Sequence, residues 1–399
     1  MEPIGPSAGL LQPVMSAAVT RLQRVVIAPD KFKGCLGASE VAEALAQGFL
    51  AARPGLDVVS RPIADGGEGT VDAVVSAGFT RVFVDVQGPT GQLVRASYAT
   101  RGRVAVIEMA EASGLARLPG GRPSPLHAST FGTGELMRHA VRSGCNDLIV
   151  GLGGSATTDG GSGMLTALGA RFLDHSGHEL AAGGAALVHL ARIESEALDA
   201  AFRGVRIVVA SDVAVALCGP AGAAAMFGPQ KGASPEQVVE LESGLARLAE
   251  VTAAHLGVDH AERRGAGAAG GTGFALLSMF GAEIRPGVDV VLDTVGFDQV
   301  IQGAGLVVTG EGAVDEQTLQ GKAPLGVLRR ARAAGAAAAL VGGRVDVSNA
   351  ELTACGFAGA WSLSALAARP SDSFDRATEL LAVVGRLIAE RFDPNDSTA

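Results

Sequence analysis

The sequence has few aromatic residues and very few lysines. Aromatic residues make up 4% of the 399 positions, so we expect a core built mostly of Ala, Val and Leu. Among the 32 lysines and arginines only four are lysines, and each lies in a glycine-flanked loop: Lys31, Lys33, Lys231 and Lys322. A lysine ammonium is compact and rotatable, and it suits phosphate contact where a planar guanidinium fits poorly. The pattern favours phosphate contact for Lys33 and Lys322, and the alternative is that four lysines fall in loops by chance.

Other absences exclude whole classes of protein. No CxxC pair occurs among the four cysteines, which indicates reduced thiols in a cytoplasmic protein; they are Cys35, Cys145, Cys218 and Cys355. No run of 18 or more apolar residues exists, and residues 1–20 have no basic residue ahead of their apolar patch. We therefore expect neither a membrane span nor a signal peptide. The net charge of −9 argues against binding to nucleic acid or to an anionic membrane.

Three familiar active-site motifs are also missing. Gly265–Gly270 matches the dinucleotide-binding pattern in its letters, but Glu262–Arg264 precedes it where a strand is needed. In Gly321–Ala323 the lysine is followed by alanine, whereas a P-loop requires Ser or Thr there. Ser155 follows two glycines and does not form the Gly-x-Ser-x-Gly turn of serine hydrolases. An NAD enzyme, a P-loop kinase and a serine hydrolase are therefore disfavoured.

Glycine, by contrast, is abundant and clusters beside acidic residues. The 56 glycines are about twice the usual share. Asp147–Val150 is a short apolar strand, and the glycine-rich turn Gly151–Met164 and a predicted helix follow it. A strand, a turn and a helix in that order aim backbone N–H groups and the positive end of a helix dipole at one spot. That spot suits phosphate, and three other glycine-rich stretches have similar features.

The order of the predicted elements indicates a two-domain α/β fold. Arg24–Pro29 and Leu56–Ile63 are predicted strands that each lead into a loop and a helix, as in a doubly wound parallel sheet. Three short strands between residues 81 and 109 indicate an antiparallel meander. Strand and helix alternate again after Leu306–Thr309, which is followed by a predicted loop, Gly310–Asp315.

These patterns set the predicted domain boundaries. We predict a Rossmann-like α/β domain made of residues 23–79 and 286–399, with an inserted mixed α+β domain at residues 80–285. Residues 1–22 are predicted to form a flexible extension. The cleft between two such domains is the default position for an active site.

Six carboxylates stand next to glycine or just after a predicted strand: Asp65, Glu68, Asp159, Asp212, Glu311 and Asp315. Phosphoryl transfer uses carboxylates to hold Mg²⁺ and to accept the proton of the attacking hydroxyl. A single aspartate of this kind is more often a helix cap or a turn residue. Six of them in four such loops strain that explanation, so the sequence predicts one phosphoryl-transfer site.

Motifs along nearly all of residues 24–390 resemble, in order, those of one known family. They are Ile27–Gly34, Ala38–Ala42, Ala64–Thr70, Glu111–Leu115, Gly132–Leu136, Gly151–Met164, Phe227–Ala233, Gly265–Gly273, Thr309–Gly312 and Gly321–Lys322. The family is that of the bacterial glycerate kinases that are unrelated to P-loop kinases. The resemblance implies a two-domain α/β fold and MgATP-dependent phosphorylation of D-glycerate, typically at the 2-hydroxyl. The sequence departs from the family pattern at Val213–Leu217, Thr158 and Ala313.

We expect the residues of the site to have the following roles. The substrate acid is held by Lys33, Asp65, Gly66, Gly67 and Glu68. The ATP phosphates are cradled by Gly153, Gly154, Ser155, Asp159, Gly267, Gly270, Gly271, Gly310 and Glu311. Asp212 and Asp315 are the candidates for Mg²⁺ ligand and general base, with the assignment between them open, and Lys322 neutralises the transferring phosphoryl group.

Two alternatives stay open at this point. One is a kinase for another small hydroxy acid, and the other is a non-catalytic nucleotide or metabolite sensor. We expect only small-molecule partners, glycerate and ATP, and a monomer or a homodimer. The sequence does not decide between a 2-phosphate and a 3-phosphate product.

Overall fold

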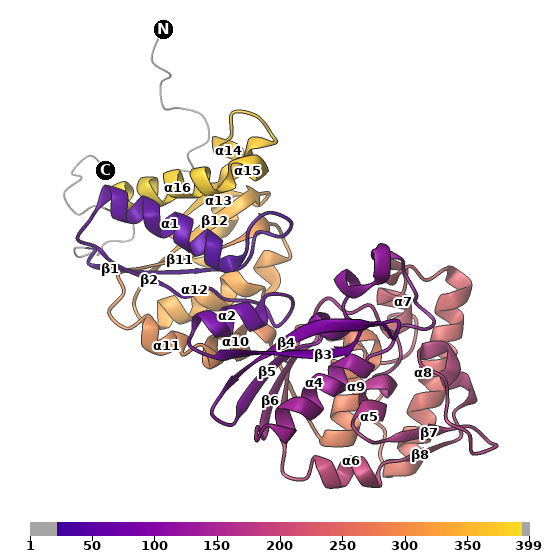
Figure 1. The fold of residues 1–399 in the computed structure, drawn as a ribbon. Helices are drawn as coiled ribbons and strands as arrows, with labels where there is room; N and C mark the ends of the chain where they lie inside the picture. The colour runs from indigo at the N-terminus through magenta and orange to yellow at the C-terminus, as the bar shows by residue number, and fades with distance from the viewer. Residues whose placement is uncertain (1–21, 393–399) are drawn as a thin grey trace. The chain divides into compact units, whose positions relative to one another are not determined.

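The computed structural model describes residues 22–392 and divides into two compact units (Figure 1). Unit 1 comprises the chain up to Asp65 together with the chain from Val291 onward, and unit 2 comprises Gly66–Val290. The predicted extension at residues 1–22 lies outside the described residues except for Leu22, which is buried in the core of unit 1.

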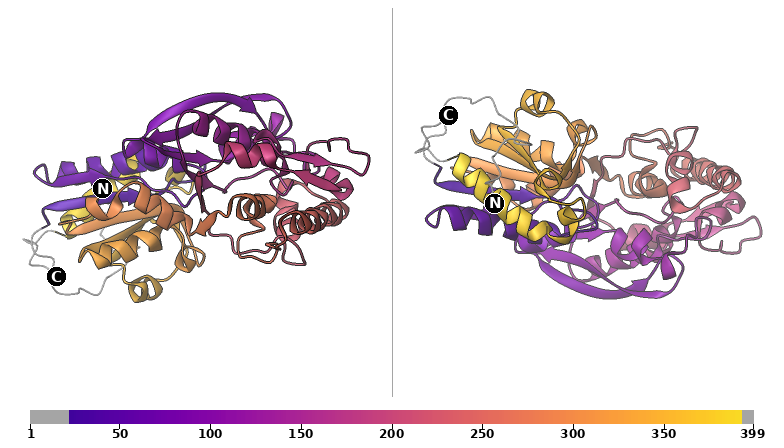
Figure 2. Two further views of the ribbon diagram at one scale, coloured as in Figure 1. Left: turned by 90° about the horizontal axis from the view of Figure 1, so that it is seen from below. Right: turned by 90° about the horizontal axis from the view of Figure 1, so that it is seen from above.

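Unit 1 is built on five parallel strands. Its sheet has the order β13-β12-β11-β1-β2, and the strands are β1 (Arg24–Pro29), β2 (Asp57–Ser60), β11 (Leu306–Val314), β12 (Ala337–Val345) and β13 (Gly359–Ser362). Helices α1 (Ala38–Ala52) and α16 (Ala377–Arg391) lie side by side on one face of the sheet (Figures 1 and 2). Helix α12 (Ala323–Ala333) packs against β11 and β12 from the other face.

The close contact of α1 with α16 depends on small residues. A Cβ atom at Gly48 would lie 2.0 Å from the Ala382 carbonyl oxygen, so only glycine lets the two backbones approach. The short helix α15 (Asp372–Asp375) precedes α16, and Arg376 separates the two. The other helices of this unit are short, and they are α11 (Phe297–Val300), α13 (Asn349–Cys355) and α14 (Leu363–Leu366).

Strand β11 corrects one prediction. The loop predicted at Gly310–Asp315 is wrong, because β11 continues to Val314 and pairs with β12 from Leu306↔Ala337 to Val314↔Val345. Glycine-rich sequence of this kind favours a turn. A Cβ atom at Gly310 would lie 2.0 Å from the Val341 carbonyl oxygen, so the glycine serves a close contact inside the sheet.

Unit 2 is built on six strands in the order β10-β9-β6-β5-β4-β3. The strands are β3 (Thr80–Gln87), β4 (Leu93–Arg101), β5 (Val104–Glu108), β6 (Asp147–Gly151), β9 (Arg206–Ala210) and β10 (Glu283–Arg285). The predicted meander is confirmed, since β3, β4 and β5 pair antiparallel. From β5 through β6 and β9 to β10 the pairing is parallel. A separate pair joins β7 (Arg171–Leu173) to β8 (Arg192–Glu194).

Helices flank this mixed sheet and follow local sequence signals. The helices are α2 (Thr70–Ser76), α3 (Ala110–Ser113), α4 (Phe131–Arg142), α5 (Ser162–Ala167), α6 (Glu196–Ala201), α7 (Ala223–Phe227), α8 (Pro235–Leu256) and α9 (Ala268–Phe280). Helix α8 begins after Ser234, whose hydroxyl accepts a hydrogen bond from the Gln237 amide, and ends at Gly257 in the left-handed conformation. Helix α10 (Gly287–Thr294) spans the passage from unit 2 back to unit 1.

The domain boundaries of the structure differ from the predicted ones mainly at the first crossing. Unit 2 begins at Gly66, ahead of residue 80, because α2 packs against β4 and β5. The predicted fold class is confirmed: a doubly wound parallel-sheet domain from both chain ends accompanies an inserted mixed domain. Between residues 22 and 392, no helix is both long and apolar enough to cross a membrane.

Candidate active site

Polar side chains gather where β11 ends in unit 1. The Thr318 hydroxyl donates a 2.5 Å hydrogen bond to Glu311 Oε1, and the Thr318 amide donates a 3.1 Å bond to Asp315 Oδ1. The ammonium of Lys322, just ahead of α12, lies 3.8 Å from Asp315 Oδ1. Three residues singled out in the sequence, Glu311, Asp315 and Lys322, are therefore neighbours in the fold. Thr318 is fully buried between the two carboxylates, and no sequence motif pointed to it.

Asp30 adds a third carboxylate, directly after the end of β1. Its side chain is buried and accepts a 2.6 Å hydrogen bond from the Lys31 amide. Burial raises the pKa of Asp30 to about 7, and the charges of Asp65 and Glu311 act in the same direction, while Lys31 opposes them. Asp65 and Glu311 therefore lie within electrostatic reach of Asp30. The search for carboxylates beside glycine missed Asp30, although it directly follows a predicted strand.

The carboxylates of this group differ in their protonation. Burial raises the pKa of Glu311, although the Thr318 hydrogen bond and the Lys322 charge partly offset it. Burial alone would also raise the pKa of Asp315, but the Thr318 amide and Lys322 outweigh it and hold that pKa below its ordinary range. Asp315 is thus an ionised group at neutral pH, whereas Asp30 can exchange a proton there.

Lys33 lies on the loop that follows β1. A Cβ atom placed on Gly312 would lie 3.1 Å from the Lys33 amide nitrogen, so this loop crosses β11 at Gly312. The Lys33 side chain is exposed. Within the described residues its ammonium has no hydrogen-bond or ion-pair partner, which leaves it available to a substrate acid.

In unit 2, two predicted loops touch at the carboxyl end of β6. A Cβ atom on Gly151 would lie 2.3 Å from the Gly66 carbonyl oxygen, and a Cβ atom on Gly153 would lie 2.5 Å from the Gly67 Cα atom. The backbone of the Gly66–Gly69 loop therefore rests directly on the start of the Gly151–Gly163 turn. Gly154 adopts φ +73°, and the Ser155 backbone bridges to Gly114.

The second glycine-rich turn also meets the first. The Gly160 amide donates a 2.9 Å hydrogen bond to the Gly270 carbonyl oxygen. A Cβ atom on Gly270 would lie 2.1 Å from the Thr157 carbonyl oxygen. Ala269, Gly270 and Gly271 all have positive φ at the start of α9, and Ala269 is the one non-glycine residue with positive φ in the described part of the chain. Such strain in a non-glycine residue is commonly found at functional sites.

The remaining glycine of this turn serves packing as well. A Cβ atom on Gly267 would lie 2.2 Å from the Ala216 carbonyl oxygen, on the loop that follows β9. Gly267, Gly270 and Gly271 are therefore required first for close backbone contact. Their contribution to a ligand site is to fix the shape of the turn.

Asp159 shapes the Gly151–Gly163 turn from inside. Its carboxylate is fully buried and accepts hydrogen bonds from the amides of Thr130, Gly161 and Gly163 and from the Thr130 hydroxyl, at 2.8–3.2 Å. Burial raises the pKa of Asp159, and these hydrogen bonds oppose the shift. The side chain thus ties the N-terminus of α4 to that of α5 and holds the turn between them.

Asp212 follows β9 at the same edge of the unit 2 sheet. Its Oδ1 accepts a 3.0 Å hydrogen bond from the Gly287 amide, at the N-terminus of α10. Gly66 approaches the end of the same strand, because a Cβ atom there would lie 2.9 Å from the Ala210 carbonyl oxygen. Asp212 therefore belongs to the same edge as the Gly66–Gly69 loop, on which Glu68 is exposed.

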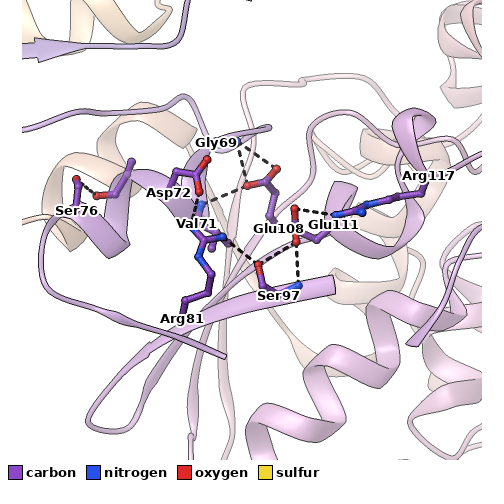
Figure 3. Close-up of polar contacts among 10 residues, drawn as sticks. Gly69, Val71, Asp72, Ser76, Arg81, Ser97, Glu108, Glu111 and Arg117 are labelled. Atoms are coloured by element: carbon purple, nitrogen blue, oxygen red, sulfur yellow. Dashed lines mark hydrogen bonds and ion pairs between the residues drawn. The ribbon is translucent and has the colours of Figure 1, made fainter. Parts of the chain in front are cut away.

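Glu108 holds the Gly66–Gly69 loop in place (Figure 3). It ends β5, is buried, and accepts hydrogen bonds of 3.1–3.3 Å from the amides of Gly69 and Val71. Burial raises the pKa of Glu108 to about 8 despite these bonds. Nearby, Glu111 accepts hydrogen bonds from Ser97 and Arg117 (Figure 3). Sequence reasoning missed Glu108, because no glycine or turn marks it.

The raised pKa of Glu108 predicts a pH-dependent stability. Between its ordinary pKa of 4.5 and about 8, the folded protein retains a proton that the unfolded chain has released. The stability that this proton contributes is fully present below the ordinary pKa and is lost as pH rises towards 8, with a slope of at most about 1.4 kcal/mol per pH unit. We expect Glu108→Gln to flatten the fall in melting temperature between pH 5 and 8. The exposed Glu240→Gln should retain the wild-type slope, and equal slopes in all three proteins would contradict the prediction.

Known proteins resemble this chain over most of its length. A family model described as the glycerate kinase family matches residues 25–393. The chain is 43% identical over 369 residues to a glycerate kinase of Bacillus subtilis (strain 168), covering 92% of this chain and 97% of that protein. It is 45% identical over 313 residues to a glycerate 2-kinase of Escherichia coli (strain K12), covering 77% of this chain and 82% of that protein.

A solved structure shares the fold. A crystal structure from Salmonella typhimurium LT2, assigned as a glycerate kinase 2, superimposes with a TM-score of 0.81 at 41% sequence identity. The match covers 93% of this chain and 98% of that one. On the family match and on these identities over most of its length, the chain belongs to the glycerate kinase family.

Proposed function

We propose that the protein transfers the γ-phosphoryl group of ATP to the 2-hydroxyl of D-glycerate. The observation that carries this proposal is the group at the end of β11, where Glu311, Asp315 and Lys322 meet around Thr318. Phosphoryl transfer depends mainly on positioning and on the stabilisation of negative charge, and this group supplies both ionised oxygens and an ammonium. Family membership supports the acceptor, and the relative in Escherichia coli is named a glycerate 2-kinase.

The protonation of the carboxylates favours a division of labour. Asp30, with a pKa of about 7, is suited to accept the proton of the attacking hydroxyl. Asp315 stays ionised and is suited to hold a cation, while Lys322 beside it faces the charge of the transferring group. Lys33 would hold the glycerate carboxylate from the loop after β1. Asp212, the Gly66–Gly69 loop and the two glycine-rich turns of unit 2 would act on the same reactants.

Mg²⁺ fits the residues that are present. Asp315 and Asp212 offer carboxylate oxygens, the ligand type that Mg²⁺ prefers. Residues 22–392 contain no cluster of three or more His, Cys, Asp or Glu side chains that could hold a metal alone. A kinase needs none, because one or two carboxylates and the nucleotide phosphates together complete the shell of the ion. When bound, the ion would neutralise charge on the phosphates.

The test is ADP release on mixing protein, ATP, Mg²⁺ and substrate. We expect turnover with D-glycerate to exceed turnover with lactate, tartronate and hydroxypyruvate by at least about tenfold, roughly 1.4 kcal/mol of discrimination. Chelation of the metal with EDTA should abolish it. A phosphorus NMR spectrum of the product distinguishes the 2-phosphate from the 3-phosphate. Binding of ATP without ADP release would favour a sensor, and a better acceptor among the other acids would redirect the substrate assignment.

A further inference from the structure

Lys231 is a buried amine to which the proposed chemistry assigns no role. It ends the short 3₁₀ turn Pro229–Lys231, and Gly232 then reverses the chain at φ +89°. The side chain is 2% exposed, although lysine is almost never fully buried unless it is paired. Its Nζ atom donates a 2.5 Å hydrogen bond to the Thr157 carbonyl oxygen.

The carbonyl that Lys231 contacts is a junction between both glycine-rich turns of unit 2. Thr157 lies within the Gly151–Gly163 turn, and the Gly270 backbone packs against the same carbonyl oxygen. Three residues further on, the Gly160 amide donates a hydrogen bond to the Gly270 carbonyl oxygen. The Lys231 amine therefore holds the point where the two turns meet.

Unsatisfied polar groups surround this junction. The hydroxyls of Thr157 and Thr158 are buried and have no hydrogen-bond partner in the part of the chain that the structure describes. Buried polar groups of this kind are uncommon in folded proteins and call for an explanation. If residue 231 served packing alone, an apolar side chain there would give a more stable protein.

The electrostatic surroundings agree with a role in binding an anion. Burial lowers the pKa of Lys231 to about 7, and the nearby Asp159 carboxylate partly opposes the shift. Asp159 itself is engaged by Thr130, Gly161 and Gly163, so it does not form a direct ion pair with Lys231. A positive charge at the junction adds to the potential of the turns, and a bound phosphate would favour the charged form of the amine.

We propose that Lys231 is a positioning residue for nucleotide binding, which fixes the two glycine-rich turns through the Thr157 carbonyl and adds positive charge beside them. The inference rests on the proposed function, because it takes the turns to be the site of the ATP phosphates. Lys231 acts through the turns, since its own side chain is enclosed.

The test compares Lys231→Met with a matched control in the same unit. Arg247→Met removes another basic side chain that donates to a backbone carbonyl, at 2.6 Å, and that carbonyl belongs to Leu190, which is part of neither turn. We expect Lys231→Met to raise the KM for ATP about tenfold while the KM for glycerate stays within about twofold. Arg247→Met should lower the melting temperature to a similar extent and leave both KM values unchanged.

Direct binding separates this inference from the proposed function. The dissociation constant of a fluorescent ATP analogue should rise about tenfold in Lys231→Met, even if no acid tested is phosphorylated. If Lys231→Met fails to fold, Lys231→Arg takes its place. This variant keeps the positive charge but replaces the ammonium that contacts the Thr157 carbonyl oxygen by a planar guanidinium. It should show a smaller rise in the same dissociation constant. An unchanged dissociation constant in the folded variant, or an equal change in Arg247→Met, overturns the inference. If the wild type phosphorylates glycerate and Lys231→Met has the wild-type dissociation constant, the inference is wrong while the proposed function stands.

Discussion

Replacing Asp315 by Asn is expected to lower kcat for glycerate phosphorylation by about 10²- to 10⁴-fold. The Asp315 carboxylate is ionised, is partly exposed, and has the Lys322 ammonium at 3.8 Å. Asparagine keeps the oxygen that accepts from the Thr318 amide, so the turn should retain its shape. It removes the negative charge, and with it the ability to hold a cation against the phosphates.

The measurement is steady-state kinetics over a range of Mg²⁺ concentrations, with the melting temperature as a check on folding. Glu316→Gln is the matched control, because it removes the adjacent and exposed carboxylate. We expect the control to keep wild-type kcat and Asp315→Asn to require more Mg²⁺ for half-maximal rate. Unchanged turnover in Asp315→Asn would remove this residue from the chemistry, and a collapse of stability would assign it to the fold.

The residues that sequence reasoning found in unit 1 share a local signature. Glu311, Asp315 and Lys322 each stand in or beside a glycine-rich stretch near the end of an apolar strand, and parallel strands end at one edge of a sheet. Thr318 carries no such mark, because its role comes from sitting between Glu311 and Asp315 after the chain turns. Glu108 is similar, since it becomes important only when β5 brings it to the amides of Gly69 and Val71.

The glycines show a different limit of sequence reasoning. A cluster of glycines indicates either a backbone conformation that other residues rarely adopt or the close approach of a second backbone. The sequence does not say which of the two applies. Gly154 has a positive φ, whereas Gly151 and Gly310 have none and instead admit a neighbouring backbone. The prediction of a loop after Thr309 is wrong for this reason. Pairing with β12, more than 25 residues further along the chain, decides the conformation of this stretch.

Gly310→Ala is therefore expected to destabilise unit 1 by about 3 kcal/mol or more, without a specific loss of ATP affinity. The added Cβ atom would lie 2.0 Å from the Val341 carbonyl oxygen in the centre of the parallel sheet, and that oxygen belongs to backbone that cannot rotate away. At this size of domain the change corresponds to a fall in melting temperature of roughly 6–12 °C.

Gly55→Ala provides the comparison, since Gly55 lies in the same unit, has no atom within 4 Å of its would-be Cβ and does not have a positive φ. Thermal unfolding followed by circular dichroism should show the fall for Gly310→Ala only. If Gly310→Ala instead unfolded like the wild type and bound ATP more weakly, Gly310 would face the nucleotide, as the sequence suggested. The expected outcome instead assigns Gly310 to the pairing of the strands. Gly310 lets β11 pair with β12 past residue 310, and that pairing carries Glu311 and the turn to Asp315 to the edge of the sheet where the carboxylates meet.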